Sequence, residues 1–168
     1  LQATPSTWLQ LVESGWHGCS TLRALVGGEP LPRSLASALL DRTSELWNMY
    51  GPTESTVWST CSRVLDDTTG ITIGRPVGGT SIEIVDRQNR PAGIGVHGEI
   101  LIGGAGLATG YVNREALTAE RFVTLAVDGN TSRYYRTGDV GSWTLGGELR
   151  ILGRLDRQLK VRGHRIEP

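Results

Sequence analysis

The hydrophobic pattern of the sequence changes near residue 70, and this change constrains the fold more than any other feature. Before it, helix and strand signals alternate. They are, in order, a helix capped by Ser6 or Thr7, a strand at 22–26, a helix that begins at Pro32 and a strand at 45–49. Such alternation is typical of a doubly wound α/β sheet, whose ligands bind beyond the carboxyl ends of the strands. Residues 1–70 therefore predict an α/β subdomain of the doubly wound kind.

Beyond residue 70 the chain consists of short apolar segments separated by turn clusters. The segments are TSIEIV, GEILIG, RYYRTG, ELRILG and QLKVRG, and one helical stretch, 113–122, interrupts them. Short strands at this spacing are typical of a small barrel or sandwich. Glycine makes up 23 of the 168 residues, about twice its usual ~7% share, and marks turns and close backbone approaches. We predict a β-rich subdomain, a small distorted β-barrel, over residues 71–154.

Composition excludes several classes of protein. The 17 Lys and Arg residues balance the 17 Asp and Glu residues, so the chain lacks the basic surface of a nucleic-acid-binding protein. No apolar run approaches the ~18 residues of a membrane span. Cys19 and Cys61 are the only cysteines and have no metal-ligand spacing. We expect a globular protein in the reducing cytoplasm, with no nucleic-acid or membrane partner.

Two loops carry polar groups where a parallel sheet would bind a ligand. The first, NMYGPTE, combines an amide, an aromatic ring, a hydroxyl and a carboxylate in Asn48, Tyr50, Thr53 and Glu54. These groups could bond a base edge, stack on it, contact a phosphate and hold Mg²⁺. From the residues alone, a Gly-Pro turn with a helix-capping threonine explains the same pattern.

The second loop, YYRTGDVG at 134–141, places Asp139 after a flexible glycine. Its carboxylate could accept both hydroxyls of a ribose, as acidic residues do in dinucleotide sites. An aspartate in a turn needs no ligand to explain it. A third segment, 153–167, is rich in basic residues. It fits either a phosphate-binding segment or a solvent-exposed charged hairpin.

Five segments together resemble the adenylation domains of nonribosomal peptide synthetases, which belong to the adenylate-forming enzyme superfamily. They are GGEPLP at 27–32, NMYGPTE at 48–54, GEILIGGAGLATGY at 98–111, YRTGDV at 135–140 and GRLDRQLKVRGHRIE at 153–167. The resemblance extends over essentially the whole chain but only the central part of the family's domain. It implies that residues 1–70 close the α/β subdomain, with the amino-acid pocket and the adenine-binding loop. It also implies that residues 155–168 hold the hinge and the first strands of a C-terminal lobe.

The resemblance implies a nucleotide site. Its residues would be Gly28, Glu29, Asn48, Tyr50, Gly51, Thr53, Asp139, Ile151 and Arg154. Asn48 would bond the adenine, Tyr50 would stack on it, and Asp139 would accept the ribose hydroxyls. Ile151 departs from the family, which often has an aromatic residue there.

The resemblance also implies catalytic residues. Thr53 would contact the α-phosphate, Glu54 would hold Mg²⁺, and Lys160 would act in the C-terminal lobe, which would turn about Asp156. The family's upstream phosphate loop and its downstream catalytic lysine are not encoded in the chain. We therefore expect the isolated fragment to be inactive.

An amino-acid pocket is implied as well. Its lining would be Gln2, Leu25, Gly27, Met49, Val57 and Trp58. Met49 and Trp58 would fill much of so small a cavity, and this lining resembles those of glycine-activating domains, with alanine as the neighbouring possibility.

The expected function is activation of an amino acid, glycine in the first place, with ATP and Mg²⁺. The aminoacyl-AMP would then be loaded on the phosphopantetheine thiol of a peptidyl carrier protein, beside the condensation domain of the same synthetase. Two alternatives stay open at this point: a fragment of an acyl- or aryl-CoA ligase, and a non-catalytic substrate-recognition module.

Overall fold

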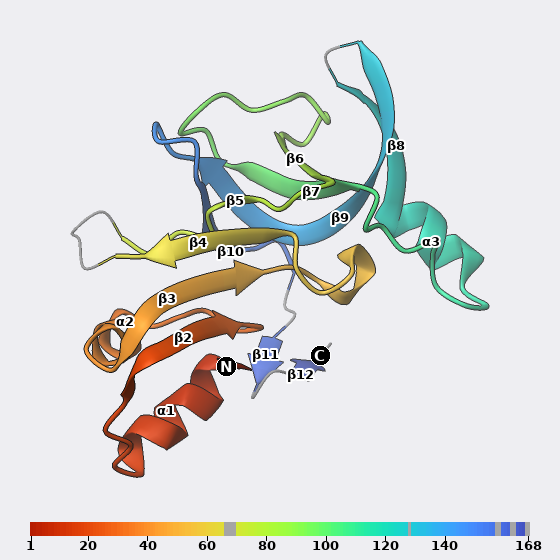
Figure 1. The fold of residues 1–168 in the computed structure, drawn as a ribbon. Coiled ribbons are helices and arrows are strands. Elements are labelled where there is room, and N and C mark those ends of the chain that lie inside the picture. Colours follow the sequence, from red (N-terminus) through yellow and green to blue (C-terminus); the bar gives the residue numbers. More distant parts are fainter. Residues whose placement is uncertain (66–69, 128, 157–158, 162–163, 167–168) are drawn as a thin grey trace.

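The computed structural model describes residues 1–65, 70–127, 129–156, 159–161 and 164–166; for 130, 159–161 and 164–166 it describes the backbone only. Two five-stranded sheets form the body, and a two-stranded hairpin of β11 (Leu159–Val161) and β12 (His164–Ile166) follows them. Figure 1 shows the two sheets lying next to each other, with the N-terminal helices beside the first sheet. No helix in these ranges is long and apolar enough to cross a membrane.

The first sheet has the strand order β1-β2-β3-β4-β5. Its strands are β1 (Gln2–Ala3), β2 (Cys19–Gly27), β3 (Thr43–Tyr50), β4 (Thr60–Val64) and β5 (Arg75–Pro76). The first three strands are parallel, and the last two are antiparallel to their neighbours. The predicted strands at 22–26 and 45–49 are thus confirmed within β2 and β3.

Helices α1 (Pro5–Glu13) and α2 (Arg33–Leu40) pack on one face of this sheet. Trp8 of α1 is 0% exposed and shares a core with Val26 and Leu46 of the strands. In the described ranges both helices lie on this face. Successive side chains of a strand point to opposite faces of the sheet, so every second residue of β2 and β3 points away from the helices. The face opposite the helices is where Gly27 and Met49 lie.

The N-terminus of α1 differs from the expected cap at Ser6 or Thr7. The capping residue is Thr4, whose hydroxyl accepts a hydrogen bond from the Thr7 backbone N–H. Pro5 explains the shift, because its fixed φ and missing N–H suit the first helical position. Pro32 precedes α2 as its N-terminal flanking residue rather than opening the helix.

The second sheet is antiparallel, with the order β10-β9-β7-β6 and β8 paired to β9. Its strands are β6 (Thr80–Val85), β7 (Gly98–Gly104), β8 (Phe122–Val127), β9 (Asn130–Trp143) and β10 (Leu149–Arg154). Helix α3 (Glu115–Arg121) precedes β8 and is shorter than the expected 113–122. Figure 1 shows β8 and β9 bending strongly, so that the sheet forms an open half-barrel.

The two sheets share a hydrophobic cluster. Tyr50 at the end of β3 is buried with Ile73, with Ile82 and Ile100 of the second sheet and with Leu149 of β10. The predicted fold class, an α/β subdomain followed by a β-rich one, is confirmed, and the predicted small distorted β-barrel is an open half-barrel. The shared cluster packs the end of β3 against β6, β7 and β10 of the second sheet.

Candidate functional site

A bulge in β9 shapes the centre of the site. Glu99 of β7 pairs with Val140 and Leu101 pairs with Arg136, so residues 137–139 of β9 lie opposite Ile100 alone. Such bulges bend a strand and re-aim its side chains. The Thr137 hydroxyl donates to the Ile100 carbonyl (2.7 Å) and accepts from the Asp139 N–H (3.0 Å).

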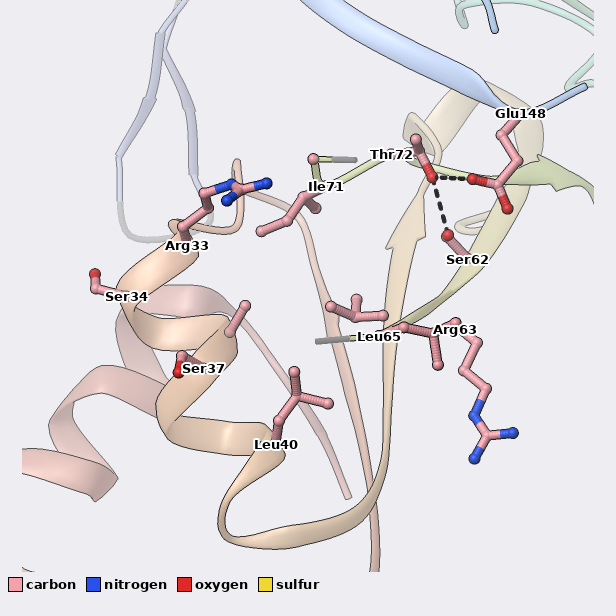
Figure 2. Close-up of a pocket in the computed structure, with 13 residues that line it drawn as sticks. Arg33, Ser34, Ser37, Leu40, Ser62, Arg63, Leu65, Ile71, Thr72 and Glu148 are labelled. Atoms are coloured by element: carbon pink, nitrogen blue, oxygen red, sulfur yellow. Dashed lines mark hydrogen bonds between the residues drawn. The ribbon is translucent and has the colours of Figure 1, made fainter. Parts of the chain in front are cut away.

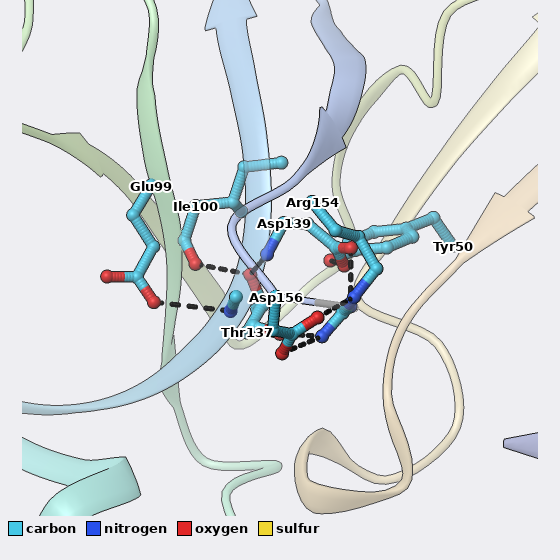
Figure 3. A network of polar contacts seen from close by, with 8 residues as sticks. Tyr50, Glu99, Ile100, Thr137, Asp139, Arg154 and Asp156 are labelled. Carbon is cyan, nitrogen blue, oxygen red and sulfur yellow. Dashed lines mark hydrogen bonds and ion pairs between the residues drawn. The ribbon is translucent and has the colours of Figure 1, made fainter. Parts of the chain in front are cut away.

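The bulge places Asp139 in a buried network of polar contacts (Figure 3). Asp139 is 6% exposed. The Tyr50 hydroxyl donates to its Oδ2 at 2.6 Å, and Arg154 Nη1 donates to its Oδ1 at 2.6 Å. A buried carboxylate is tolerated only with such partners. Burial, and then the negative charge of Asp139, raises the pKa of Tyr50 well above its usual value, so the phenol stays a donor.

Arg154 connects Asp139 to the predicted hinge. Its Nε and Nη2 donate to the two carboxylate oxygens of Asp156 at 2.7 and 2.8 Å, a two-pronged pair. Burial lowers the pKa of Arg154, but the hydrogen bonds to Asp156 and the charge of Asp139 raise it on balance. The guanidinium is therefore a fixed cation between two carboxylates.

A cavity of about 530 Å³ opens beside this network. Of the nine predicted nucleotide residues, eight line it: Gly28, Glu29, Asn48, Tyr50, Gly51, Asp139, Ile151 and Arg154. Met49, predicted for the amino-acid pocket, also lines it. The lining residues that the sequence did not predict for any site are Pro30, Leu31, Ile71, Ile73, Leu152 and Gly153. The apolar alternation at 71–73 was the one signal that could have pointed to Ile71 and Ile73.

Two residues on the predicted adenine side are held by hydrogen bonds. The Asn48 amide nitrogen donates to the Thr72 carbonyl at 2.8 Å. The Glu29 carboxylate accepts from the backbone N–H and the hydroxyl of Ser6, in the first turn of α1, at 3.1 and 2.6 Å. Both side chains therefore line the cavity in fixed positions.

Thr53 and Glu54 lie outside the cavity lining, in the short 3₁₀ helix η1 (Thr53–Ser55) that follows the Gly-Pro turn. Thr53 is exposed, whereas Glu54 is 6% exposed. The Tyr111 hydroxyl donates to Glu54 Oε1 at 2.6 Å. Burial and this contact raise the pKa of Tyr111, so that it remains a donor. The structure thus orients the Glu54 carboxylate, although it does not bring it to the cavity wall.

Four of the residues predicted to line an amino-acid pocket lie on β1, β2 and β3: Gln2, Leu25, Gly27 and Met49. Gln2 pairs with Leu25, and Gly27 pairs with Met49. A Cβ on Gly27 would lie 2.4 Å from Cη2 of Trp58, so the indole packs directly against the glycine backbone.

The loop that delivers Trp58 is unusual. Thr56 and Val57 have φ values of 59° and 71°, a left-handed conformation that a β-branched residue rarely adopts. Val57 itself is 55% exposed. Strain of this kind persists where surrounding structure enforces it, and it clusters at binding sites.

A second cavity, of about 350 Å³, lies between α2 and β4 (Figure 2). Its polar end is formed by Thr72, whose hydroxyl donates to Glu148 at 2.7 Å and meets the Ser62 hydroxyl at 3.0 Å. Among the side chains that the structure describes, no predicted site residue lines it.

Other predictions concern the C-terminal segment and metals. The backbone of Lys160 lies in β11, and its side chain is outside the described part. Within the described ranges, no group of three or more His, Cys, Asp or Glu side chains could hold a metal ion. Glu54, the residue predicted to hold Mg²⁺, is a single buried carboxylate. Mg²⁺ in phosphoryl-transfer sites is usually bound by one or two carboxylates together with substrate phosphates.

Comparisons with known proteins bear on the family. The family of AMP-binding enzymes matches residues 1–112. A dimodular nonribosomal peptide synthase of Bacillus subtilis is 44% identical over 168 residues, which are 99% of this chain and 7% of that protein. The chain therefore spans a small part of this relative's length.

Solved structures give the same result. A four-domain nonribosomal peptide synthetase, bound to AMP and glycine, is 48% identical with a TM-score of 0.88, over 99% of this chain and 13% of the other. A protein with adenylation and PCP domains, bound to a vinylsulfonamide inhibitor, is 34% identical with a TM-score of 0.86, over 98% and 30%. The chain belongs to the AMP-binding enzyme family and, within it, to the adenylation domains of nonribosomal peptide synthetases.

Proposed function

We propose that the domain containing this chain activates an amino acid with ATP and transfers it to a carrier protein. An oxygen of the amino-acid carboxylate attacks the α-phosphorus, and the bond from that phosphorus to the bridging oxygen of pyrophosphate breaks. Aminoacyl-AMP and pyrophosphate result. The phosphopantetheine thiol then attacks the acyl carbon and gives up its proton, AMP leaves, and a thioester forms.

The observation that carries this proposal is the gathering of eight predicted nucleotide residues around one cavity, with Asp139 held at its edge. A carboxylate oxygen has more than one lone pair, so Asp139 can accept ribose hydroxyls while it keeps Tyr50 and Arg154. The base would lie near Tyr50 and Asn48, next to the 28–29 backbone. The positioning of substrates accounts for much of the rate of such a reaction.

Thr53, Glu54 and the C-terminal segment would serve the same reaction. Thr53 would contact the α-phosphate, and Glu54 would hold Mg²⁺, which when bound neutralises phosphate charge. Residues 155–168 would form the first part of the C-terminal lobe. Asp156 would be the hinge, and Lys160 would lie in the part of the lobe that rotates. Residues 1–70 and 71–154 would be the preceding subdomains.

The proposed partners are a peptidyl carrier protein and a condensation domain of the same synthetase. The solved relative with adenylation and PCP domains supports the first of them. The two cysteines, Cys19 and Cys61, are both free, which fits a reducing, cytoplasmic setting.

Glycine is the proposed substrate, because Trp58 packs against Gly27 and Met49 is its strand neighbour. The solved relative bound to AMP and glycine, at 48% identity, supports the same choice. Acid-dependent exchange of pyrophosphate into ATP tests this choice of substrate. It is measured on the complete domain with a panel of amino acids, aryl acids and fatty acids. We expect glycine to give the highest rate and alanine the next. Exchange that depends on aryl or fatty acids, with CoA as acceptor, would replace the proposal by that of a CoA ligase.

Replacing Trp58 by alanine should widen the specificity of the complete domain. Removal of the indole opens space beside Gly27, so larger side chains should enter while glycine activation falls only a few-fold, roughly the effect of changed packing. The measurement is kcat/KM for glycine, alanine, valine and leucine. Trp16→Ala, an indole that packs against Trp8 on the helical face, is the matched control. An unchanged ranking in Trp58→Ala would remove Trp58 from the pocket.

The 168-residue chain alone should give no exchange above a blank without enzyme. Its sequence encodes neither the phosphate loop nor the catalytic lysine that the resemblance implies for the whole domain. Exchange by this chain, purified to homogeneity and assayed with glycine and each of the other amino acids, would contradict the assignment of those roles to segments outside it.

A further inference from the structure

The segment 98–111 is the one family-like motif to which the sequence assigned no role. Glu99 lies near its start, on β7, and pairs with Val140, the residue that follows the bulge of β9. Its carboxylate Oε1 accepts a hydrogen bond from the Gly138 N–H at 3.2 Å. Figure 3 shows Glu99 on the side of the bulge away from Arg154 and Tyr50.

The bulge needs side-chain partners, because its three residues lie opposite Ile100 alone. Buried backbone N–H and C=O groups must find partners elsewhere when a ladder is interrupted. Thr137 bonds the Ile100 carbonyl and the Asp139 N–H, and Glu99 takes the N–H of Gly138. The side chains of Thr137 and Glu99 therefore replace the missing strand hydrogen bonds.

Gly138 is the residue on which the geometry of the bulge depends. Its φ is +72°, and a Cβ there would lie 2.9 Å from Arg154 Nη2 and 3.0 Å from Asp156 Oδ2. Its carbonyl accepts from the Leu155 N–H at 2.8 Å. Glu99 thus fixes the N–H of Gly138, and Leu155, which precedes the predicted hinge residue Asp156, fixes its carbonyl.

Glu99 is itself held in place. Its Oε2 forms an ion pair with Arg136 Nη1, and the two side chains are only 12% and 25% exposed. Arg136 also contacts the side-chain oxygen of Asn89. A paired and mostly buried carboxylate has little rotamer freedom, so it can act as a rigid support for the bulge.

We propose that Glu99 is a positioning residue for nucleotide binding: it fixes the Gly138 peptide so that the carboxylate of Asp139 is directed at the ribose. This inference rests on the proposed function, because it takes the ribose of ATP as the ligand of Asp139. Glu99 does not line the cavity, and it acts only through the bulge of β9.

The test compares ATP with 2′,3′-dideoxy-ATP in the exchange reaction of the complete domain. Glu99→Ala should raise the KM for ATP about tenfold, the scale of one lost hydrogen bond to a charged group, and leave kcat within about twofold. The KM for the dideoxy nucleotide, which lacks the hydroxyls, should hardly change. The preference for ATP should therefore fall about tenfold.

Two further variants separate positioning from packing. Glu99→Gln keeps an oxygen acceptor for Gly138 and should retain the preference for ATP within about threefold. The double variant Glu99→Met with Arg136→Met removes the acceptor and both charges while it keeps the packing, and it should lose the preference as Glu99→Ala does. Glu120→Ala, an exposed carboxylate of α3, is the control and should behave as the unmodified domain.

The outcomes are distinct. If Glu99→Ala is poorly folded, the double variant decides the question, with thermal unfolding measured beside the kinetics. An unchanged preference for ATP over 2′,3′-dideoxy-ATP would overturn the inference. So would a KM that rises equally for both nucleotides. If Asp139→Ala also leaves the preference unchanged, the ribose assignment itself fails; if Asp139→Ala abolishes it and the Glu99 variants do not, only the role of Glu99 is wrong.

Discussion

Replacing Asp139 by alanine should raise the KM for ATP by about 10- to 150-fold in the complete domain. The change removes the acceptor for the ribose hydroxyls, and a lost hydrogen bond to a charged group costs about 1.5–3 kcal/mol. It also leaves Tyr50 without the carboxylate to which its hydroxyl donates at 2.6 Å. ATP-dependent exchange at saturating glycine measures the effect.

Asp86→Ala is the matched control for this experiment. Asp86 is an aspartate of the turn after β6, where it accepts hydrogen bonds from the Gln88 and Arg90 backbone, and it does not line the cavity. We expect its KM for ATP to match that of the unmodified domain. If Asp139→Ala behaved like Asp86→Ala, the bulge at 137–139 would have no role in binding ATP.

Replacing Asp156 by proline should block one of the two half-reactions. If the C-terminal lobe rotates about this residue, proline fixes φ near −65° and removes a backbone donor, so one orientation becomes inaccessible. Adenylate formation should survive within a few-fold, and transfer to the carrier thiol should fall by about 100-fold or more, the scale of effects from misplaced reacting groups. The two rates are measured separately, by exchange and by loading of the carrier.

The structure makes a control necessary here, because the Asp156 carboxylate also binds Arg154. Asp156→Ala removes this contact without restricting φ. Any loss that the two variants share belongs to the lost ion pair, and the additional loss of transfer in Asp156→Pro belongs to the hinge. Equal transfer rates in the two variants would place the hinge elsewhere.

Local patterns in the sequence predicted much of the fold. Helical spacing located α1, α2 and α3, and short apolar runs between turn residues located β2, β3, β6, β7, β10 and part of β9. These signals depend on neighbours a few residues away. β8 was missed, since Phe122 looks like the last residue of a helix until its pairing with Tyr135 of β9 is known. The cap of α1 was placed two or three residues late, because a proline at the first helical position outweighs the serine and threonine that follow.

The site was only partly predictable for a similar reason. Family-like motifs selected most of the residues that meet in the cavity, but not how they contact one another. Tyr50 and Asp139 are separated by 89 positions, and Gly138 and Glu99 by 39. Whether such pairs meet depends on strand register and on a bulge, which no local pattern encodes. Leu152 was missed because it too lies at a register shift, between Ile151 and Gly153.

A crystal structure of the complete domain with AMP tests the central claim most directly, since the claim is that the nucleoside binds in the cavity between the two sheets. We expect the ribose hydroxyls within hydrogen-bond distance of the Asp139 carboxylate and the adenine ring against Tyr50, near Asn48. AMP bound instead in the cavity lined by Ser62 and Glu148, or a ribose that makes no contact with Asp139, would contradict it.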